Sequence, residues 1–229
     1  MPKNSGLMFK PDMILAYING EKNQTRRTKG LNKINENPDE WEFLGIEEGK
    51  SAIFKNTKQP HLHFSASLPY GCIFDTLYFK ETWKMWSNSA DGEGFLHYRA
   101  DDAKVRPTWW TLDIWKMPDP FWYPEHAFTK WQSSMFMPRL CSRFREVPIL
   151  SVHVERLWDI TEEDAKNEGC KPIPLGTMSQ FLSEPDSLSY RLGYFRLWDE
   201  INGKTLPSSK NLWLFVYKFP RFEGLEGQE

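Results

Sequence analysis

The chain has 229 residues, of which 40% are hydrophobic, and a formal net charge of -2. A chain of this length can bury one substantial core, so its length alone does not require a second domain. Its near-neutral charge excludes the strongly basic balance of proteins that coat duplex nucleic acid, so any nucleic-acid contact is expected to be local.

The first predicted element is a helix near the N-terminus. Apolar pairs at Met13–Ile14 and Tyr17–Ile18 recur at helical spacing, with Pro11 in the first turn, where proline is tolerated. Gly20 is the expected stop. The segment that follows Gly20 therefore begins where a helix ends.

The middle of the chain predicts strands separated by two irregular inserts. Residues 28–68 are polar and without clear periodicity, which indicates an insert. The aromatic and branched residues of 73–83 predict a strand, with Glu81 at or just beyond its end. A second insert is expected at 84–128, where only the segment 95–101 has the clear pattern of a strand.

The C-terminal third predicts two strands and two helices. In 148–160, apolar residues alternate with polar ones, as in a half-buried strand, at Leu150, Val152 and Val154. The stretch 161–169 predicts a short helix with Thr161 as N-cap, ending at Gly169.

A second helix is expected in residues 187–203, and 211–219 is a nearly continuous apolar strand. The apolar face of that helix is predicted from residues at helical spacing, namely Leu188, Leu192, Phe195 and Trp198. Strands joined by irregular loops, with few short helices, predict an α+β fold: one domain, residues 1–229, built on a mostly antiparallel β-barrel with short flanking helices.

The segment GEKNQTRR, residues 20–27, contains the pattern G-x-K-x-x-T-x-R. By itself, the pattern is compatible with a solvated basic turn after a helix. It also places Lys22 three residues before Thr25, which is a spacing that allows a base to meet a hydroxyl.

Six segments in order resemble ASCH-domain proteins, particularly the long phage and prophage members. They are MFKPDMILAYINGEKNQTRR, YGCIFDTLYFKETW, KWQSSMFMPRLCSRF, VHVERLWDITEEDAKNEG, FRLWDEING and LWLFVYKF. The resemblance covers most of the chain outside the two inserts. It implies a PUA-like fold, a class of RNA-binding pseudo-barrels, and hence a nucleoside or single-stranded RNA as the ligand.

One small bacterial ASCH protein is an N(4)-acetylcytidine amidohydrolase with a lysine base, a threonine nucleophile and a glutamate proton donor. Its K-x-x-T spacing falls on Lys22 and Thr25 in this chain, and its T-E-x-x-A-x-x-E stretch matches TEEDAKNE, which places the glutamate at Glu168. The resemblance thus implies Lys22, Thr25 and Glu168 as the catalytic residues.

These roles make physical demands on the surroundings. A threonine hydroxyl needs a base, and a lysine is a base only when burial or nearby positive charge, here Arg26 or Arg27, lowers its pKa. A carboxylic acid that protonates the leaving amine must be partly protonated, so Glu168 is expected in an apolar or crowded pocket. Lys22, Thr25 and Glu168 are therefore expected to converge in one cleft.

Further residues are candidates for binding substrate. Arg27 can bind a phosphate or carbonyl oxygen, or form an ion pair that holds its loop. Glu81 and Arg139 resemble pocket-lining ASCH positions, with a loop anchor as the alternative for Glu81. The tryptophan-rich stretch can stack on bases or belong to the core. Its candidates are Trp83, Trp109, Trp110 and Trp131, of which Trp131 is carried forward as a binding residue.

Cysteine and histidine spacing favours neither disulfides nor a metal site. Cys72, Cys141 and Cys170 are odd in number and far apart, and His61 and His63 lack further ligands nearby, so no metal or cofactor is expected. Cys141 is expected to be a buried small hydrophobe. No apolar run has the length of a signal peptide or a membrane span, which predicts a cytoplasmic protein with no membrane partner.

Three functions stay open on the sequence. An amidohydrolase requires a lowered lysine pKa and contact between Lys22 and Thr25. A non-catalytic binding module for RNA or a modified nucleotide, or a ribonuclease, requires an open basic groove with exposed aromatic residues. A phage interaction protein requires an exposed apolar patch away from the cleft.

Overall fold

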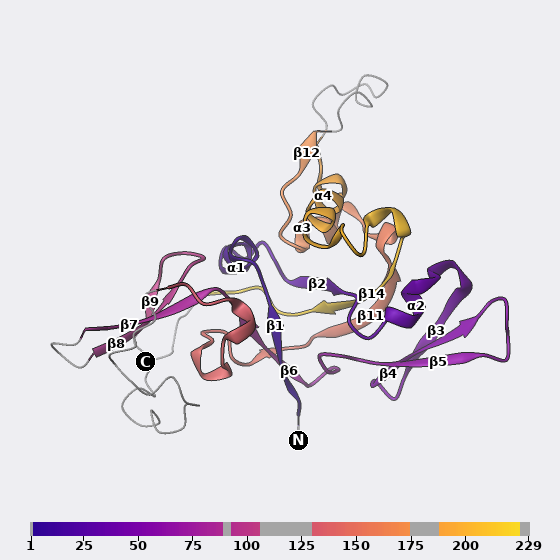
Figure 1. Cartoon of the computed structure of the whole chain (residues 1–229), viewed down its shortest axis with the longest axis horizontal. Helices are drawn as coiled ribbons and strands as arrows, with labels where there is room; N and C mark the ends of the chain where they lie inside the picture. Colours follow the sequence, from indigo (N-terminus) through magenta and orange to yellow (C-terminus); the bar gives the residue numbers. More distant parts are fainter. Residues whose placement is uncertain (1, 89–92, 106–129, 175–187, 225–229) are drawn as a thin grey trace. The chain divides into compact units, whose positions relative to one another are not determined.

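The computed structural model describes residues 2–88, 93–105, 130–174 and 188–224 (Figure 1). It has an α+β fold in which short strands form small sheets, in the orders β1-β6-β10, β11-β14-β2, β12-β13, β3-β4-β5 and β7-β8-β9. None of these sheets closes into a barrel within the described residues. The strands are β1 (Asn4–Met8), β2 (Gln24–Arg27), β3 (Trp41–Glu47), β4 (Ser51–Asn56), β5 (His63–Ser67), β6 (Thr76–Lys80), β7 (Trp83–Asn88), β8 (Glu93–Tyr98), β9 (Lys104–Val105), β10 (Val147–Pro148), β11 (Ser151–Arg156), β12 (Ile173–Pro174), β13 (Leu188–Ser189) and β14 (Trp213–Lys218). The α-helices are α1 (Pro11–Ile18), α2 (Asn32–Glu36), α3 (Glu162–Asn167) and α4 (Tyr190–Asn202).

The chain divides into two compact units. The first comprises Met1–Lys3, Ala16–Thr76 and Pro148–Glu229, and the second comprises Asn4–Leu15 and Leu77–Val147. The expectation of a single domain stays a prediction.

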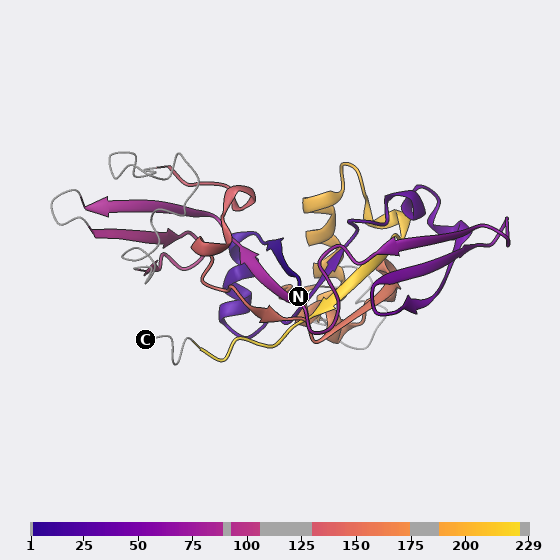
Figure 2. The same cartoon turned by 90° about the horizontal axis from the view of Figure 1, so that it is seen from below.

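The sheet β11-β14-β2 is the centre of the first unit, and both of its pairings are antiparallel. Helices α3 and α4 cover one face, where Tyr194 and Trp198 share a buried cluster with Leu214 (Figure 1). The sheet β3-β4-β5 lies against the other face, where the rings of Phe54 and Trp213 are 5.5 Å apart (Figure 2). The central strand β14, predicted from its apolar run, is thus buried on both sides.

The expectation that residues 28–68 are irregular is wrong. They contain α2 and the antiparallel sheet β3-β4-β5. Strand β4 alternates as a half-buried strand should, with Ala52 and Phe54 inward. The signal was weak because this strand has only two apolar inward residues, and because the register shifts between Phe43 and Gly45 in β3.

The second unit contains the sheets β1-β6-β10 and β7-β8-β9. Strand β6 ends at Lys80, so Glu81 lies just beyond it, as predicted. Within the expected insert 84–128, the described residues form most of β7 together with β8 and β9, while residues 89–92 and 106–128 lie outside the described part. Alternation in β7 and β8 places Trp83, Met85 and Tyr98 in a buried cluster with Cys141.

Most predicted helices are confirmed in position. Helix α1 begins at Pro11 and ends before Gly20, and the Thr161 side chain caps α3 by accepting a hydrogen bond from the Asp164 N–H. The buried face of α4 is the predicted one only in part: Trp198 is buried and Phe195 half-buried, whereas Leu192 is exposed and the unpredicted Tyr194 is buried.

This difference arises because the helix begins only at Tyr190, which leaves the exposed Leu188 in β13, and because the buried Tyr194 and Trp198, four residues apart, define a face that excludes Leu192. Leu150 is likewise exposed, whereas Val154 of the same predicted strand is buried. No helix in the described ranges is both long and apolar enough to cross a membrane.

Candidate functional site

The first unit buries Lys22 against Glu168. Lys22 pairs with Glu168 in an isolated antiparallel bridge, and their side chains meet with Nζ 3.0 Å from Oε2. Lys22 Nζ also donates to the backbone oxygens of Gln24 and Glu168, each at 2.7 Å. These three acceptors match the three protons of an ammonium group. Only 1% of Lys22 and 5% of Glu168 are exposed, so the pair lies in a dry environment.

Gly169 allows this close approach. Its φ is +80°, and a Cβ at this position would lie 2.8 Å from the Ala16 Cβ and 3.2 Å from the Lys22 Cβ. Any other residue would meet both a strained backbone and a clash. The glycine that was predicted as the stop of α3 therefore also sets the distance between Lys22 and the end of α3.

Burial lowers the pKa of the Lys22 ammonium below its ordinary value of 10.5. Glu168 opposes this shift because its negative charge and hydrogen bond favour the charged lysine, whereas the positive charge of Arg27 assists it. The lowered lysine pKa that amide chemistry requires is thus present, with desolvation as its main cause.

The second oxygen of Glu168 accepts from Arg26, whose Nη1 lies 3.0 Å from Oε1. Arg26 also donates from Nε to Glu155 at 2.6 Å and lies 3.7 Å from Asp164. Its guanidinium is 5.8 Å from the centre of the Tyr194 ring. The result is a buried network of alternating charges that ties β2 to β11, α3 and α4.

Sequence reasoning missed three members of this network, namely Glu155, Asp164 and Tyr194. Glu155 is a polar position in an alternating strand, and Asp164 is the residue whose N–H the Thr161 cap accepts from. Nothing local indicates that both turn toward one arginine, because the contacts cross 129 and 138 residues of chain.

Thr25 lies on the other face of β2 from Arg26. Successive side chains of a strand point to opposite faces, so Gln24 and Arg26 share the face of α3, and Thr25 shares the opposite face with Arg27. Thr25 is buried and pairs across the sheet with Tyr217, whose hydroxyl accepts from the Tyr70 N–H at 3.3 Å. Lys22 and Glu168 therefore converge, whereas the Thr25 side chain faces away from the network that joins them to Arg26, so the expected convergence of all three side chains is not observed.

Glu81 belongs to a different cluster, in the second unit. Arg143 donates to both of its oxygens, at 2.9 and 2.8 Å, and to both oxygens of Asp101, at 2.7 and 3.0 Å. Glu81 is fully buried, and burial raises its pKa while Arg143 opposes the shift. The guanidinium lies 4.5 Å from the centre of the Tyr98 ring. This geometry is that of an anchor between loops, the alternative considered for Glu81.

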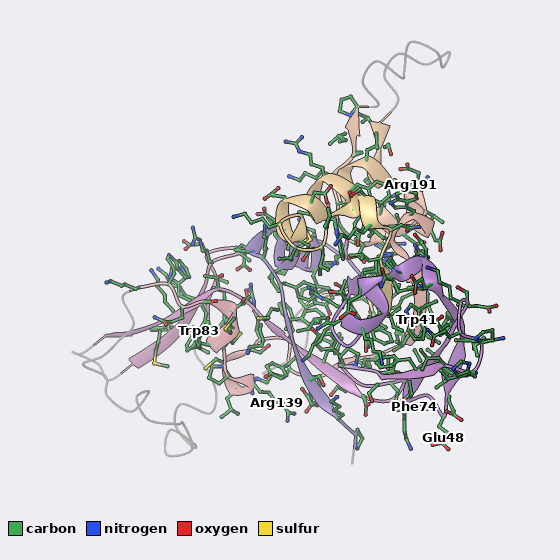
Figure 3. The ribbon with its side chains drawn as sticks, turned by 45° about the vertical axis from the view of Figure 1, so that its right-hand side comes forward. Trp41, Glu48, Phe74, Trp83, Arg139 and Arg191 are labelled. Atoms are coloured by element: carbon green, nitrogen blue, oxygen red, sulfur yellow. The ribbon has the colours of Figure 1, made fainter. Side chains whose placement is uncertain are left out.

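Two further candidates of the second unit, Arg139 and Trp83, are labelled in Figure 3. Arg139 is half exposed and pairs with Glu146 at 2.8 Å. Trp83 is a core residue with no exposed surface, whereas Trp131 is half-buried and lies 4.8 Å from the ring of His97. The candidates Trp109 and Trp110 lie outside the described residues.

Two of the three cysteines, Cys141 and Cys170, are buried. Burial raises the thiol pKa of Cys141 to about 12, as expected for a small hydrophobe. Burial also raises that of Cys170, which lies near Lys22, to about 12. His61 and His63 are exposed. Among the residues that the structure describes, no group of three or more acidic, cysteine or histidine side chains is placed to hold a metal ion.

Comparisons of the chain with family models, with curated proteins and with solved structures gave no match.

Proposed function

We propose that the Lys22–Glu168 pair is the catalytic centre of an amidohydrolase that removes the acyl group from an N(4)-acylated cytidine or a related base. The observation that supports this most is the 3.0 Å contact between a buried lysine and a buried glutamate, together with the lowered pKa of the lysine. A PUA-like barrel belongs to the same proposal, since the sheet β11-β14-β2, whose strand β2 begins two residues after Lys22, is antiparallel and packs on helices α3 and α4.

The contact explains how both groups reach their reactive forms. Transfer of one proton from Lys22 Nζ to Glu168 Oε2 gives a neutral amine and a carboxylic acid. The amine then takes the proton of the Thr25 hydroxyl as its oxygen attacks the acyl carbon. Glu168 protonates N4 as its bond to the acyl carbon breaks, so that cytidine leaves.

Water next hydrolyses the acyl-threonine, which releases the carboxylic acid and restores Thr25. The sum is one amide plus one water giving cytidine and a carboxylic acid, which then loses its proton to solvent. The scheme requires the Thr25 side chain to turn toward Lys22, because in the structure it lies on the face of β2 opposite to Arg26. The role of Thr25 therefore rests on the resemblance to ASCH enzymes alone.

Hydrolysis of N(4)-acetylcytidine by the purified chain tests the proposal. We expect Lys22→Met and Glu168→Gln each to lower kcat/KM by at least about 100-fold, the usual contribution of an acid or base. Lys204→Met, at an exposed lysine, is the matched control and should retain activity. Equal turnover by wild type, Lys22→Met and Glu168→Gln would contradict the proposal.

A second candidate is a non-catalytic pocket for a modified nucleotide. It is favoured by the position of Thr25 on the face of β2 opposite to Arg26. This function predicts calorimetric binding of N(4)-acetylcytidine without release of acetate, and Thr25→Val that binds as wild type does. Loss of turnover in Thr25→Val, with binding kept, would instead support the nucleophile.

A further inference from the structure

The segment that follows β14, residues 219–224, is held to the first unit at two points. The Phe219 N–H donates to the Asn23 backbone oxygen at 2.8 Å, directly beyond the pairing of β14 with β2. The ring of Tyr17, in the last turn of α1, lies 5.7 Å from the ring of Phe219 and 5.6 Å from that of Phe222. Tyr17 is buried in these contacts, and burial raises the pKa of its hydroxyl to about 12.

Arg221 lies between these two points and bridges two other parts of the same unit. Its Nη1 donates to the Gly20 backbone oxygen, and its Nη2 donates to the Asn167 side-chain oxygen at 2.6 Å. Gly20 lies two residues before Lys22, and Asn167 lies directly before Glu168. One exposed arginine therefore binds the chain beside each member of the buried pair.

This arginine strengthens a link that the backbone also makes. The Asn23 N–H donates to the Asn167 backbone oxygen at 3.0 Å, and Arg221 binds the side chain of the same asparagine. Helix α1 ends two residues before Gly20, and α3 ends at Asn167, so the guanidinium binds near two helix C-termini, where the helix dipole favours a cation. Its planar fork holds two acceptors at once, which the single ammonium of a lysine does less well.

We propose that Arg221 is a positioning residue, which keeps Lys22 in contact with Glu168 by holding together the two segments that carry them. The contact between Lys22 Nζ and Glu168 Oε2 is 3.0 Å, so a shift of either segment by about 1 Å takes it beyond the range of a hydrogen bond. The consequence for catalysis rests on the proposed amidohydrolase, whereas the effect on Lys22 itself does not.

Titration of Lys22 tests this role without any substrate. In protein labelled with 13C at the lysine ε-carbon, the signal of interest is the one that is absent from Lys22→Met. In Arg221→Met we expect the Lys22 pKa to rise toward 10.5, because water that enters the loosened contact relieves the desolvation that lowers it. Arg221→Lys keeps the charge and one donor, so its rise should be smaller. Arg196→Met, at an exposed arginine of α4, is the matched control and should titrate as wild type does.

Asn167→Ala removes the same link from the other side, and it provides the test if Arg221→Met does not fold. Because both variants remove one contact, the double variant Arg221→Met/Asn167→Ala should shift the Lys22 pKa no further than the larger single effect. A Lys22 pKa in Arg221→Met that equals the wild-type value or lies below it would overturn the proposal. Additive shifts in the double variant would also overturn it.

Hydrolysis of N(4)-acetylcytidine adds a readout that depends on the proposed function. Arg221→Met should lower kcat by about tenfold with KM unchanged, since the residue acts through Lys22. This is less than the roughly 100-fold cost of a 1 Å misplacement, because the bond from Asn23 to Asn167 remains. Absence of turnover in wild type would contradict the amidohydrolase alone, and the titration would still decide whether Arg221 positions Lys22.

Discussion

Two buried glutamates of this protein have similar exposure but different partners. Glu81 faces one arginine that holds both of its oxygens, whereas Glu168 divides its oxygens between Arg26 and Lys22. An arginine stays charged at every accessible pH, so the pair of Glu81 and Arg143 can only be an anchor. A buried lysine can lose its proton, so the pair of Glu168 and Lys22 can exchange one. Burial of charge alone therefore does not indicate a reactive site.

The anchor should show the largest effect on stability. Arg143→Met leaves Glu81 buried without its cation, and we expect a loss of about 3–5 kcal/mol in the free energy of unfolding. Arg139→Met, at a half-exposed arginine paired with Glu146, should cost less than about 1 kcal/mol. Urea denaturation of both variants measures the difference. Similar costs for the two would show that Glu81 does not depend on Arg143.

The sequence predicted one of these pairs far better than the other. The segments K-x-x-T and TEEDAKNE were both visible in the sequence, and their resemblance to an ASCH enzyme led to Lys22 and Glu168. Glu81 and Arg143 are 62 residues apart in the sequence, and no periodic pattern around either residue indicates that the two are in contact.

In the fold too, features that neighbouring residues determine were predicted, and features that depend on distant contacts were not. Strands with continuous apolar runs, such as β14, were predicted, whereas β4, with two inward apolar residues, was not. The contacts of Arg26 and the face of β2 on which Thr25 lies depend on the register in which β2 pairs with β14. The apolar pattern within each strand does not predict the register between two strands that are far apart in the sequence.

A smaller loss is expected when the Lys22 cluster is disturbed through the backbone. Gly169→Ala introduces a Cβ that clashes with Ala16 and Lys22 at a φ of +80°, and should cost about 3 kcal/mol. Gly49→Ala is the matched control, because its φ is +66° but its Cβ would meet nothing within 4 Å, so only the strain of about 1 kcal/mol applies. Thermal unfolding should rank them in this order, and equal costs would mean that Gly169 is not tightly packed.

The pH dependence of stability separates the two clusters further. Between the lowered pKa of Lys22 and the ordinary value of 10.5, the unfolded chain binds a proton that the folded chain has released. The contribution of this lysine to the free energy of unfolding therefore increases as the pH rises through that window, by about 1.4 kcal/mol for each unit by which its pKa is lowered.

Lys22→Met removes this gain. The difference in unfolding free energy between wild type and Lys22→Met should become more favourable to wild type from pH 7 to pH 10. A flat or falling difference would exclude a lowered pKa for Lys22.

The two clusters should be alike in one respect, the inertness of their neighbouring thiols. Cys170 lies near Lys22 and Cys141 belongs to the core beside Tyr98, and burial raises both thiol pKa values to about 12. Iodoacetamide should therefore modify the half-buried Cys72 first in the folded protein, as peptide mass mapping can show. Modification of Cys170 ahead of Cys72 would indicate that the Lys22 cluster is open to solvent.

Titration of Lys22 itself tests the central claim most directly. In protein labelled with 13C at the lysine ε-carbon, the resonance that is absent from Lys22→Met should titrate with a pKa below 10.5. In Glu168→Gln the same resonance should titrate at still lower pH, because the glutamate charge and hydrogen bond that favour the ammonium are gone. A pKa at or above 10.5 in wild type would contradict the account, since Lys22 would then be a structural cation like Arg143.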